Sequence, residues 1–212
     1  MAASPGIVTR IFALYRDNIL QAEDVIKKFR ETGALLEGHF VLASGLHSTN
    51  YLQCALVLQH PRNAEKFGQA IAEHFLRESI QLVASPAIGG IVIGHEVARA
   101  LGARFVWTER EVGKMTLRRG FSVSKGERTL IVEDVLTTGG STRLTAEAVQ
   151  AGGANVLAAA SIIDRSGGKA DIGIPRIALA TLDIPSVNPS VCNACKRGEP
   201  AIKPGSRKSD LS

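Results

Sequence analysis

Two strand–loop–helix units in the middle of the chain constrain its fold more than any other feature. The first runs from Gln81 as QLVAS, PAIGG and IVIGHEVARALG and leads into the apolar segment ARFVWTE. The second runs from Thr129 as TLIVED, VLTTGG and STRLTAEAVQAGG and leads into NVLAAASIID. This alternation predicts an α/β fold in which a parallel sheet carries helices on both faces. Ligands of such sheets bind beyond the carboxyl ends of the strands, where SPAIGG, EDVLTTGG and DRSGG fall.

The segments before these units predict smaller elements. Apolar residues at helical spacing predict one helix over about residues 17–32 and another over residues 62–78. Between them, apolar runs on either side of a turn at residues 44–45 predict two strands of a hairpin or small sheet ending at Pro61. We expect residues 17–60 to form a small N-terminal hood over the sheet.

Two further segments are expected to contain little regular structure. Residues 109–120 are polar and broken by glycine, which predicts a mobile hairpin loop between the two units. The tail, residues 185–212, is loop-rich, and its last residues, 205–212, are expected to be disordered. The length suits a single domain over residues 1–212.

Composition and charge narrow the class of protein. Lys and Arg exceed Asp and Glu by five, which favours an anionic partner but fits a nucleic acid and a phosphorylated metabolite equally. Aromatic residues make up 5%, and no basic stretch is interleaved with rings, so a single-strand nucleic-acid binder is not indicated. Charges at Arg10, Arg16 and Asp17 argue against a secretory signal, and the apolar tract QLVASPAIGGIVIG is too short to cross a membrane. Three cysteines indicate a reducing compartment, so we expect a cytoplasmic protein.

The stretch LIVEDVLTTGGST, residues 130–142, carries the most chemistry. Small residues at a helix N-terminus direct backbone N–H groups at one point, so residues 137–141 are suited to hold a phosphate. Glu133 and Asp134 would repel a phosphate beside them, but their oxygens suit sugar hydroxyls or the water shell of Mg²⁺. Together they fit a ribose 5-phosphate. The alternative is a glycine-rich turn with solvated carboxylates; GxxxxGK[ST] and GxGxxG are both missing.

With three hydrophobic residues followed by two acidic residues and a small-residue loop, this stretch resembles the phosphoribosyl-diphosphate signature of type I phosphoribosyltransferases. The rest of the chain, over about residues 20–207, is similar to orotate phosphoribosyltransferases. EGHFVLASGLHSTNYLQ resembles their hood, SPAIGG their diphosphate loop, TEREVGKMTLRRGF their catalytic loop and IIDRSGG their base site. CNACKRGEPAIKPGSR resembles the tail of one bacterial branch. The resemblance implies Mg²⁺-dependent transfer of ribose 5-phosphate from phosphoribosyl diphosphate to orotate by a homodimer.

The resemblance also implies a role for individual residues. Catalysis falls to Arg110, Lys114 and Asp134, with the loop shared across subunits and Arg118 and Arg119 as further candidates. Phosphoribosyl diphosphate is expected to contact Ser85, Gly89, Gly90, Arg110, Lys114, Glu133, Asp134, Val135, Leu136, Thr137, Thr138, Gly139, Gly140 and Ser141. Orotate is expected to contact Tyr51, Leu52, Thr137 and Arg165. Mg²⁺ is expected to bind through substrate and water near Glu133 and Asp134, with no direct protein ligand.

Purely structural roles for the same residues, and other functions, stay open. SPAIGG can be a tight strand-to-helix turn, and each basic residue of the loop can be a solvated charge. Arg165 can form an ion pair with Asp164 or Asp171. The function can also be transfer to another base, or sensing of phosphoribosyl diphosphate by a regulator without activity, although the chain shows no DNA-recognition helix.

Three positions depart from the better-known members of the family. Those members have a lysine where this chain has Ala43 and another where it has Gly89. They also have a histidine two residues after the loop lysine, whereas Lys114 is followed by Met115 and Thr116. Proton relay by a loop histidine is therefore excluded, and orotate needs no side-chain base if it binds as the anion.

The histidines and cysteines give no clear metal signal. No metal-ligand spacing is present among the five histidines, which we expect at hood or helix surfaces: His39, His47, His60, His74 and His95. Cys192 and Cys195 have the gap of a zinc knuckle, but a closed site needs four ligands and Cys54 is far upstream. Two ordinary thiols are favoured over a zinc shared across a dimer or a CxxC disulfide, and the three options stay open.

Overall fold

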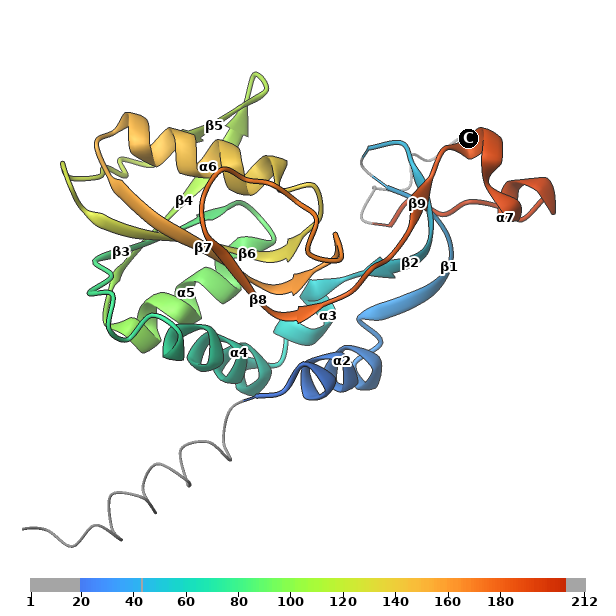
Figure 1. The fold of residues 1–212 in the computed structure, drawn as a ribbon, viewed down its shortest axis with the longest axis horizontal. Helices are drawn as coiled ribbons and strands as arrows, with labels where there is room; N and C mark the ends of the chain where they lie inside the picture. The colour runs from blue at the N-terminus through green and yellow to red at the C-terminus, as the bar shows by residue number, and fades with distance from the viewer. Residues whose placement is uncertain (1–19, 43, 205–212) are drawn as a thin grey trace, which may run out of the picture.

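The computed structural model describes residues 20–42 and 44–204, which form two sheets with their helices (Figure 1). The larger sheet has six strands in the order β5-β4-β3-β6-β7-β8. Neighbouring strands are parallel except β5, which is antiparallel to β4. Their bounds are β3 Leu82–Pro86, β4 Arg104–Glu111, β5 Lys114–Leu117, β6 Arg128–Leu136, β7 Asn155–Asp164 and β8 Arg176–Thr181. The predicted α/β fold with a largely parallel sheet is confirmed.

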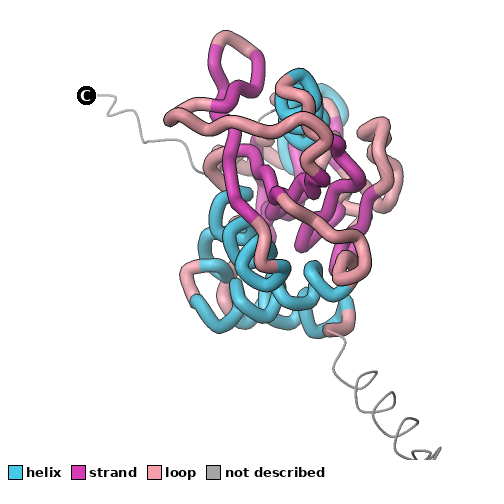
Figure 2. Tube along the Cα trace, turned by 90° about the vertical axis from the view of Figure 1, so that its left-hand side faces the viewer, coloured by secondary structure: helices cyan, strands magenta, loops and turns pink. Residues whose placement is uncertain are grey.

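Helices cover both faces of this sheet (Figures 1 and 2). On one face lie α4 (Pro61–Glu73) and α5 (Gly90–Leu101), with α2 (Ala22–Glu31) and α3 (Cys54–Leu58) beside them; α6 (Gly140–Ala151) lies on the other. Along β3, Val83 packs into the core under α4 and α5, whereas Leu82 and Ala84 pack into the core under α6. This alternation follows from the two-residue period of a strand, and burial on both faces explains why β3 reads as continuously apolar.

A glycine sets how closely α4 and α5 pack. A Cβ built at Gly68 would lie 2.6 Å from Cβ of Glu96, so any larger residue would push the two helices apart. The close contact lets Phe67 and Ile71 of α4 reach Ile93 in the same core.

The smaller sheet forms the hood and contains three antiparallel strands in the order β1-β2-β9. Their bounds are β1 Leu35–Val41, β2 His47–Leu52 and β9 Ser186–Val187, and the short helices η1 (Pro189–Val191) and α7 (Asn193–Lys196) follow β9. The tail returns to the hood: the N–H of Val41 donates to O of Ile202 at 2.8 Å, and the N–H of Ile202 donates to O of His39 at 2.8 Å. Two ends of the described chain therefore build the hood together (Figure 1).

The structure corrects several predicted element bounds. Helix α2 begins at Ala22, later than predicted, because Gln21 has extended backbone angles of φ −80° and ψ 153°. Residues 54–58 are helical, whereas the sequence predicted strand as far as Pro61. A five-residue apolar run such as CALVL has no period that separates a strand from a buried helix, which explains the error. Helix α4 ends at Glu73 rather than at residue 78, and turns follow.

The tail is more regular than predicted, since β9 and α7 both fall within it. Strand β8 was not anticipated either. Its sequence, RIALAT, is apolar enough for a strand, but no glycine loop and helix precede it to give the pattern of the other units. The predicted hairpin at residues 109–120 is present as β4 paired with β5.

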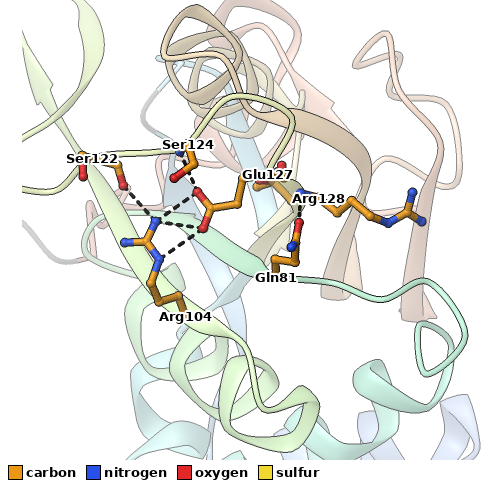
Figure 3. A network of polar contacts seen from close by, with 7 residues as sticks. Gln81, Arg104, Ser122, Ser124, Glu127 and Arg128 are labelled. Atoms are coloured by element: carbon orange, nitrogen blue, oxygen red, sulfur yellow. Dashed lines mark hydrogen bonds and ion pairs between the residues drawn. The ribbon is translucent and has the colours of Figure 1, made fainter.

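Polar contacts fix the amino ends of the sheet, at the opposite end from the glycine loops (Figure 3). The guanidinium of Arg104 donates to both carboxylate oxygens of Glu127, at 3.0 Å each, and to O of Ser122 at 3.0 Å. The Glu127 carboxylate also accepts from the N–H of Ser124 at 2.8 Å. These contacts tie the loop before β6 to the start of β4.

Some expectations fall outside the described residues. They concern the N-terminal segment with Arg10, Arg16 and Asp17, the family lysine position at Ala43, and disorder of residues 205–212. Within the described residues, no helix combines the length and apolar character that a bilayer crossing requires.

Candidate active site

A cavity of about 930 Å³ lies where the carboxyl ends of the central strands meet the hood. The structure brings most of the predicted site residues to its wall: Tyr51, Leu52, Gly89, Arg110, Glu133, Asp134, Val135, Thr137, Thr138, Gly139, Gly140, Ser141 and Arg165. Four predicted residues are not part of this wall, namely Ser85, Gly90, Lys114 and Leu136. Residues from five separate segments of the sequence therefore converge on one cavity.

The loop between β6 and α6 forms one side of the cavity. Gly139 has a φ of 76°, the left-handed region that favours glycine, and a Cβ built there would run into Cγ2 of Ile172. This backbone turn places Gly140 and Ser141, the first residues of α6, on the cavity wall. The positive end of a twelve-residue helix therefore opens onto the cavity, as an anion site requires.

Two carboxylates form the floor beside this loop. The hydroxyl of Thr142 donates a short hydrogen bond to Glu133, and the N–H of Val135 donates to Oδ1 of Asp134 at 2.9 Å. Burial raises the pKa of Glu133 to about 7 and also raises the pKa of Asp134 above its usual range. Carboxylates that have lost this much water are stabilised as anions when hydroxyl groups or a cation are placed against them.

The SPAIGG loop crosses directly over one of these carboxylates. A Cβ built at Gly89 would lie 2.7 Å from Oδ2 of Asp134. The loop contains a cis peptide bond between Ala87 and Ile88. Ser85 was predicted to contact the ligand but is fully buried beneath the loop. A Cβ built at Gly90 would lie 3.0 Å from Cβ of Ser85. Leu136 is buried in the core in the same way.

The hairpin of β4 and β5 contributes Arg110 to the cavity of its own chain. One Nη of Arg110 donates to Oγ of Ser141 at 3.5 Å, so the guanidinium lies above the loop at the start of α6. Lys114 is exposed and lies outside the cavity wall. It lies opposite Glu111 in the strand register of β4 and β5. Beside them Val112, at the tip, is 98% exposed.

The two other basic candidates of the hairpin face an acidic residue. Nε of Arg119 lies 2.5 Å from Oε1 of Glu109, and Nη1 of Arg118 lies 3.7 Å from Oε2 of the same side chain. These ion pairs agree with the interpretation of both arginines as surface charges.

Arg165 lies at the end of β7, where the hood meets the cavity, and only 9% of it is exposed. One Nη donates to Oγ of Ser48 at 3.0 Å, and Nε has no hydrogen-bond partner among the described residues. Burial lowers the pKa of Arg165. The expected alternative, an ion pair with Asp164 or Asp171, is not found among the described residues: Asp164 pairs with Arg176, and the Asp171 carboxylate accepts from the N–H of Gly173. A buried guanidinium without a carboxylate partner in the described chain favours an anionic ligand.

Sequence reasoning missed several residues at this site. Cys54 is buried next to the Asp134 carboxylate, which together with desolvation raises the pKa of the thiol well above its usual range. Ser48 accepts from Arg165 and donates to O of Pro185 at 3.1 Å, linking the hood, β7 and the tail. No local pattern marks either residue, because their partners lie far away in the sequence.

The expectation that the histidines lie at surfaces is wrong for two of them. His39 and His47 are buried, and both lie beside the Cys192 and Cys195 thiols. The error arose because spacing along the chain detects ligands only within one element, whereas these four residues come from β1, β2 and the tail.

The comparisons with known proteins agree with this fold. Residues 55–179 match the family model of the phosphoribosyl transferase domain. A crystal structure of orotate phosphoribosyltransferase from Aeropyrum pernix is similar with a TM-score of 0.59 and 25% identity, covering 74% of this chain and 92% of that chain. The fold and the loop at the start of α6 define a type I phosphoribosyltransferase.

The curated relatives narrow the class further. Orotate phosphoribosyltransferase from Pelotomaculum thermopropionicum is 52% identical over 186 residues, which cover 88% of this chain and 98% of the relative. Orotate phosphoribosyltransferase from Thermotoga maritima is 48% identical and covers 86% of this chain and 98% of the relative. The chain belongs to the orotate phosphoribosyltransferase family.

Proposed function

We propose that this protein transfers the 5-phosphoribosyl group from phosphoribosyl diphosphate to N1 of orotate. The products are orotidine 5′-monophosphate and diphosphate, in the de novo synthesis of UMP. The observation that carries the choice of base is Arg165, a buried cation facing the cavity without a carboxylate partner among the described residues. Orotate supplies that carboxylate, whereas uracil, adenine, hypoxanthine and guanine do not.

The loop at residues 137–141 and the N-terminus of α6 hold the 5-phosphate in this proposal, because both line the cavity. Glu133 and Asp134 then accept hydrogen bonds from the ribose hydroxyls beside it. Their negative charge also stabilises the positive charge that develops on the ribose ring when the bond to diphosphate breaks, as in glycoside cleavage.

Mg²⁺ fits the same corner of the cavity. The available donors are carboxylate oxygens, the ligand type that Mg²⁺ prefers. No basic group is among the causes that shift the pKa of either carboxylate. Glu133 and Asp134 would hold the ion through water and substrate oxygens, without direct coordination. When bound, the ion neutralises charge on the diphosphate leaving group.

The β4–β5 hairpin closes the site over the diphosphate. Arg110 is already placed for this task in its own chain, next to Ser141. Lys114 lies on the exposed part of the hairpin, and we assign it to the site of a neighbouring subunit in a homodimer. Cations that arrive with a closing loop act in a site emptied of water, where they stabilise the departing charge strongly.

Orotate binds between the hood and β7. Arg165 pairs with its carboxylate, the backbone at Tyr51 and Leu52 faces the ring, and Thr137 contacts the base from the opposite loop. We place the enzyme in the cytoplasm, consistent with three cysteines that form no disulfide in the structure.

The test is the loss of orotate absorbance when purified protein is mixed with orotate, phosphoribosyl diphosphate and Mg²⁺. Uracil, adenine, hypoxanthine and guanine are assayed in parallel by release of diphosphate. Turnover of orotate alone supports the proposal. Turnover of another base would reassign the substrate, and binding of phosphoribosyl diphosphate with no turnover of any base would favour a regulator.

A further inference from the structure

A second cluster of reactive side chains lies in the hood, outside the wall of the cavity. It consists of His39 in β1, His47 in β2, Cys192 after η1 and Cys195 in α7. One ligand atom from each residue lies within 4.8 Å of the other three. None of the four lines the cavity. We propose that these four residues bind one zinc ion that fastens the tail to the hood.

The distances between sulfur and nitrogen match a tetrahedral zinc site. Sγ of Cys192 lies 3.5 Å from Nε2 of His39, and Sγ of Cys195 lies 3.6 Å from the same nitrogen and 3.2 Å from Nδ1 of His47. Bond lengths of about 2.3 Å to sulfur and about 2.0 Å to nitrogen place such ligands about 3.5 Å apart in a tetrahedron. The cluster therefore already has nearly the dimensions of the ligand shell.

Among the measured pairs, the two ring nitrogens must separate most. Nε2 of His39 lies 2.7 Å from Nδ1 of His47, a hydrogen-bond distance, whereas two nitrogen ligands of zinc lie about 3.3 Å apart. An imidazole rotation on a hood strand supplies this small movement. Histidine protonation also matters, because both nitrogens must be unprotonated to coordinate the ion.

The surroundings of His39 fix the correct nitrogen for coordination. Nδ1 of His39 lies 2.9 Å from the carbonyl oxygen of Glu199, which can only accept a hydrogen bond. Nδ1 therefore carries the proton, and the lone pair of Nε2 points at the thiols. A backbone carbonyl that accepts from the second nitrogen of a histidine ligand is the usual outer contact of zinc sites.

The donor set identifies the metal. Two thiolates and two imidazoles at tetrahedral spacing favour zinc over Mg²⁺ or Ca²⁺, which prefer oxygen. Two thiolates also neutralise the charge of the ion, so the centre suits a location where His39, His47 and Cys192 are buried. Because four protein ligands leave no open position for water, the site is structural rather than catalytic.

The zinc would act on the active site through β2. His47 begins this strand, Ser48 accepts the hydrogen bond from Arg165, and Tyr51 and Leu52 line the cavity near its end. Fastening the tail therefore fixes the strand on which the base pocket is built. This consequence rests on the proposed function, whereas zinc binding itself does not.

The first measurement is the metal content of the wild-type protein, purified without a metal-affinity tag and then dialysed against buffer containing ZnCl₂ followed by metal-free buffer. About one zinc ion per chain is expected. Replacement of zinc by Co²⁺ should give visible bands of tetrahedral cobalt and a near-ultraviolet sulfur-to-cobalt band. Wild-type protein that retains no zinc, or a cobalt spectrum without thiolate bands, overturns the proposal whether or not the enzyme is active.

Variants locate the site. Cys192→Ser and Cys195→Ser are expected to lose the bound zinc and to melt several degrees below wild type, as is wild type treated with a chelator. Cys54→Ser and His95→Gln are the matched controls and should keep the zinc, because Cys54 lies in α3 and His95 in α5, and neither belongs to the cluster. Zinc that persists in the Cys192→Ser, Cys195→Ser double variant contradicts the assignment, as does a Cys192–Cys195 disulfide found by mass spectrometry of wild-type protein that was alkylated without prior reduction.

Discussion

Gly89 lies directly against the carboxylate of Asp134, since a Cβ at Gly89 would lie only 2.7 Å from Oδ2. The φ of Gly89 is −56°, which any residue adopts, so glycine is required here for space rather than for backbone conformation. In this chain, a side chain at position 89 would displace either the SPAIGG loop or the Asp134 carboxylate.

Gly89→Ala should therefore impair the site more than the fold. We expect the KM for phosphoribosyl diphosphate to rise about tenfold or more, because the methyl group displaces either the loop or Asp134. Steady-state kinetics and a melting curve provide the readouts. Gly140→Ala serves for comparison, since its Cβ would meet nothing closer than Thr138 Oγ1 at 3.7 Å, and it should raise KM less. Equal effects of the two changes would contradict the steric argument.

The pKa of Glu133 predicts how stability depends on pH. Burial raises this pKa from 4.5 to about 7, so the folded state binds a proton more tightly than the unfolded state does. The stabilisation is fully present below pH 4.5 and is lost as the pH rises through 7. It amounts to about 3 kcal/mol. Urea unfolding at pH 5 and pH 8 should show that Glu133→Gln loses less stability over this interval than wild type. Parallel losses in both proteins would show that Glu133 is not the group responsible.

Arg165→Met should change base selection. Loss of a charged hydrogen bond in a desolvated pocket costs about 1.5–3 kcal/mol, so the KM for orotate should rise about 10- to 100-fold. The KM for phosphoribosyl diphosphate should change little. Uracil is orotate without the carboxylate, so the preference of the enzyme for orotate over uracil should shrink in the variant. A preference that stays intact would remove Arg165 from the base pocket.

The two hairpin cations can be assigned to subunits by mixing variants. Arg110→Ala and Lys114→Ala should each lower kcat/KM without changing the fold. For the test, the Lys114→Ala variant and the inactive Asp134→Asn variant are unfolded and refolded together. If Lys114 acts in the partner's site, half of the resulting dimers contain one intact site. The mixture should then recover about a quarter of the wild-type activity. Arg110→Ala mixed with Asp134→Asn should recover none, since Arg110 contacts Ser141 of its own chain. Recovery in the second mixture only would reverse the two assignments.

The Arg104–Glu127 contact should matter for stability alone. The Glu127 carboxylate accepts from Nε and one Nη of Arg104 and from the N–H of Ser124, and its side chain is only 10% exposed. Glu127→Ala should lower the free energy of unfolding by about 1–2 kcal/mol and leave kcat unchanged. Arg143→Ala removes the exposed Arg143–Glu147 pair on α6 and should cost no more than about 0.5 kcal/mol.

The parts of the fold that sequence predicted are those with a local signal. The alternation of strand, glycine loop and helix from residue 81 to residue 164 carries its own period and punctuation, and the sheet formed as expected. Short segments had no such signal: Cys54–Leu58 has five apolar residues, and Ser186–Val187 becomes a strand only because β2 lies beside it. The partner strand of Ser186–Val187 lies more than a hundred residues away in the sequence.

The same distinction applies to the sites. The β6–α6 loop could be recognised because its carboxylates, hydroxyls and glycines are consecutive. The environment of Arg165 could not, since its contact Ser48 is 117 residues away. The His39, His47, Cys192 and Cys195 cluster was misjudged for the same reason, because 153 residues separate His39 from Cys192.

The return of the tail to the hood also sets an order for folding during synthesis. The helices and parallel strands up to β8 can assemble as they leave the ribosome. One edge of β2 remains unpaired until β9 is synthesised, and β1 lacks its backbone hydrogen bonds to Ile202 until that residue is added. The hood side of the cavity is therefore among the last parts of the molecule to be completed. A nascent chain stalled before residue 186 would carry a finished β6–α6 loop beside an unfinished hood.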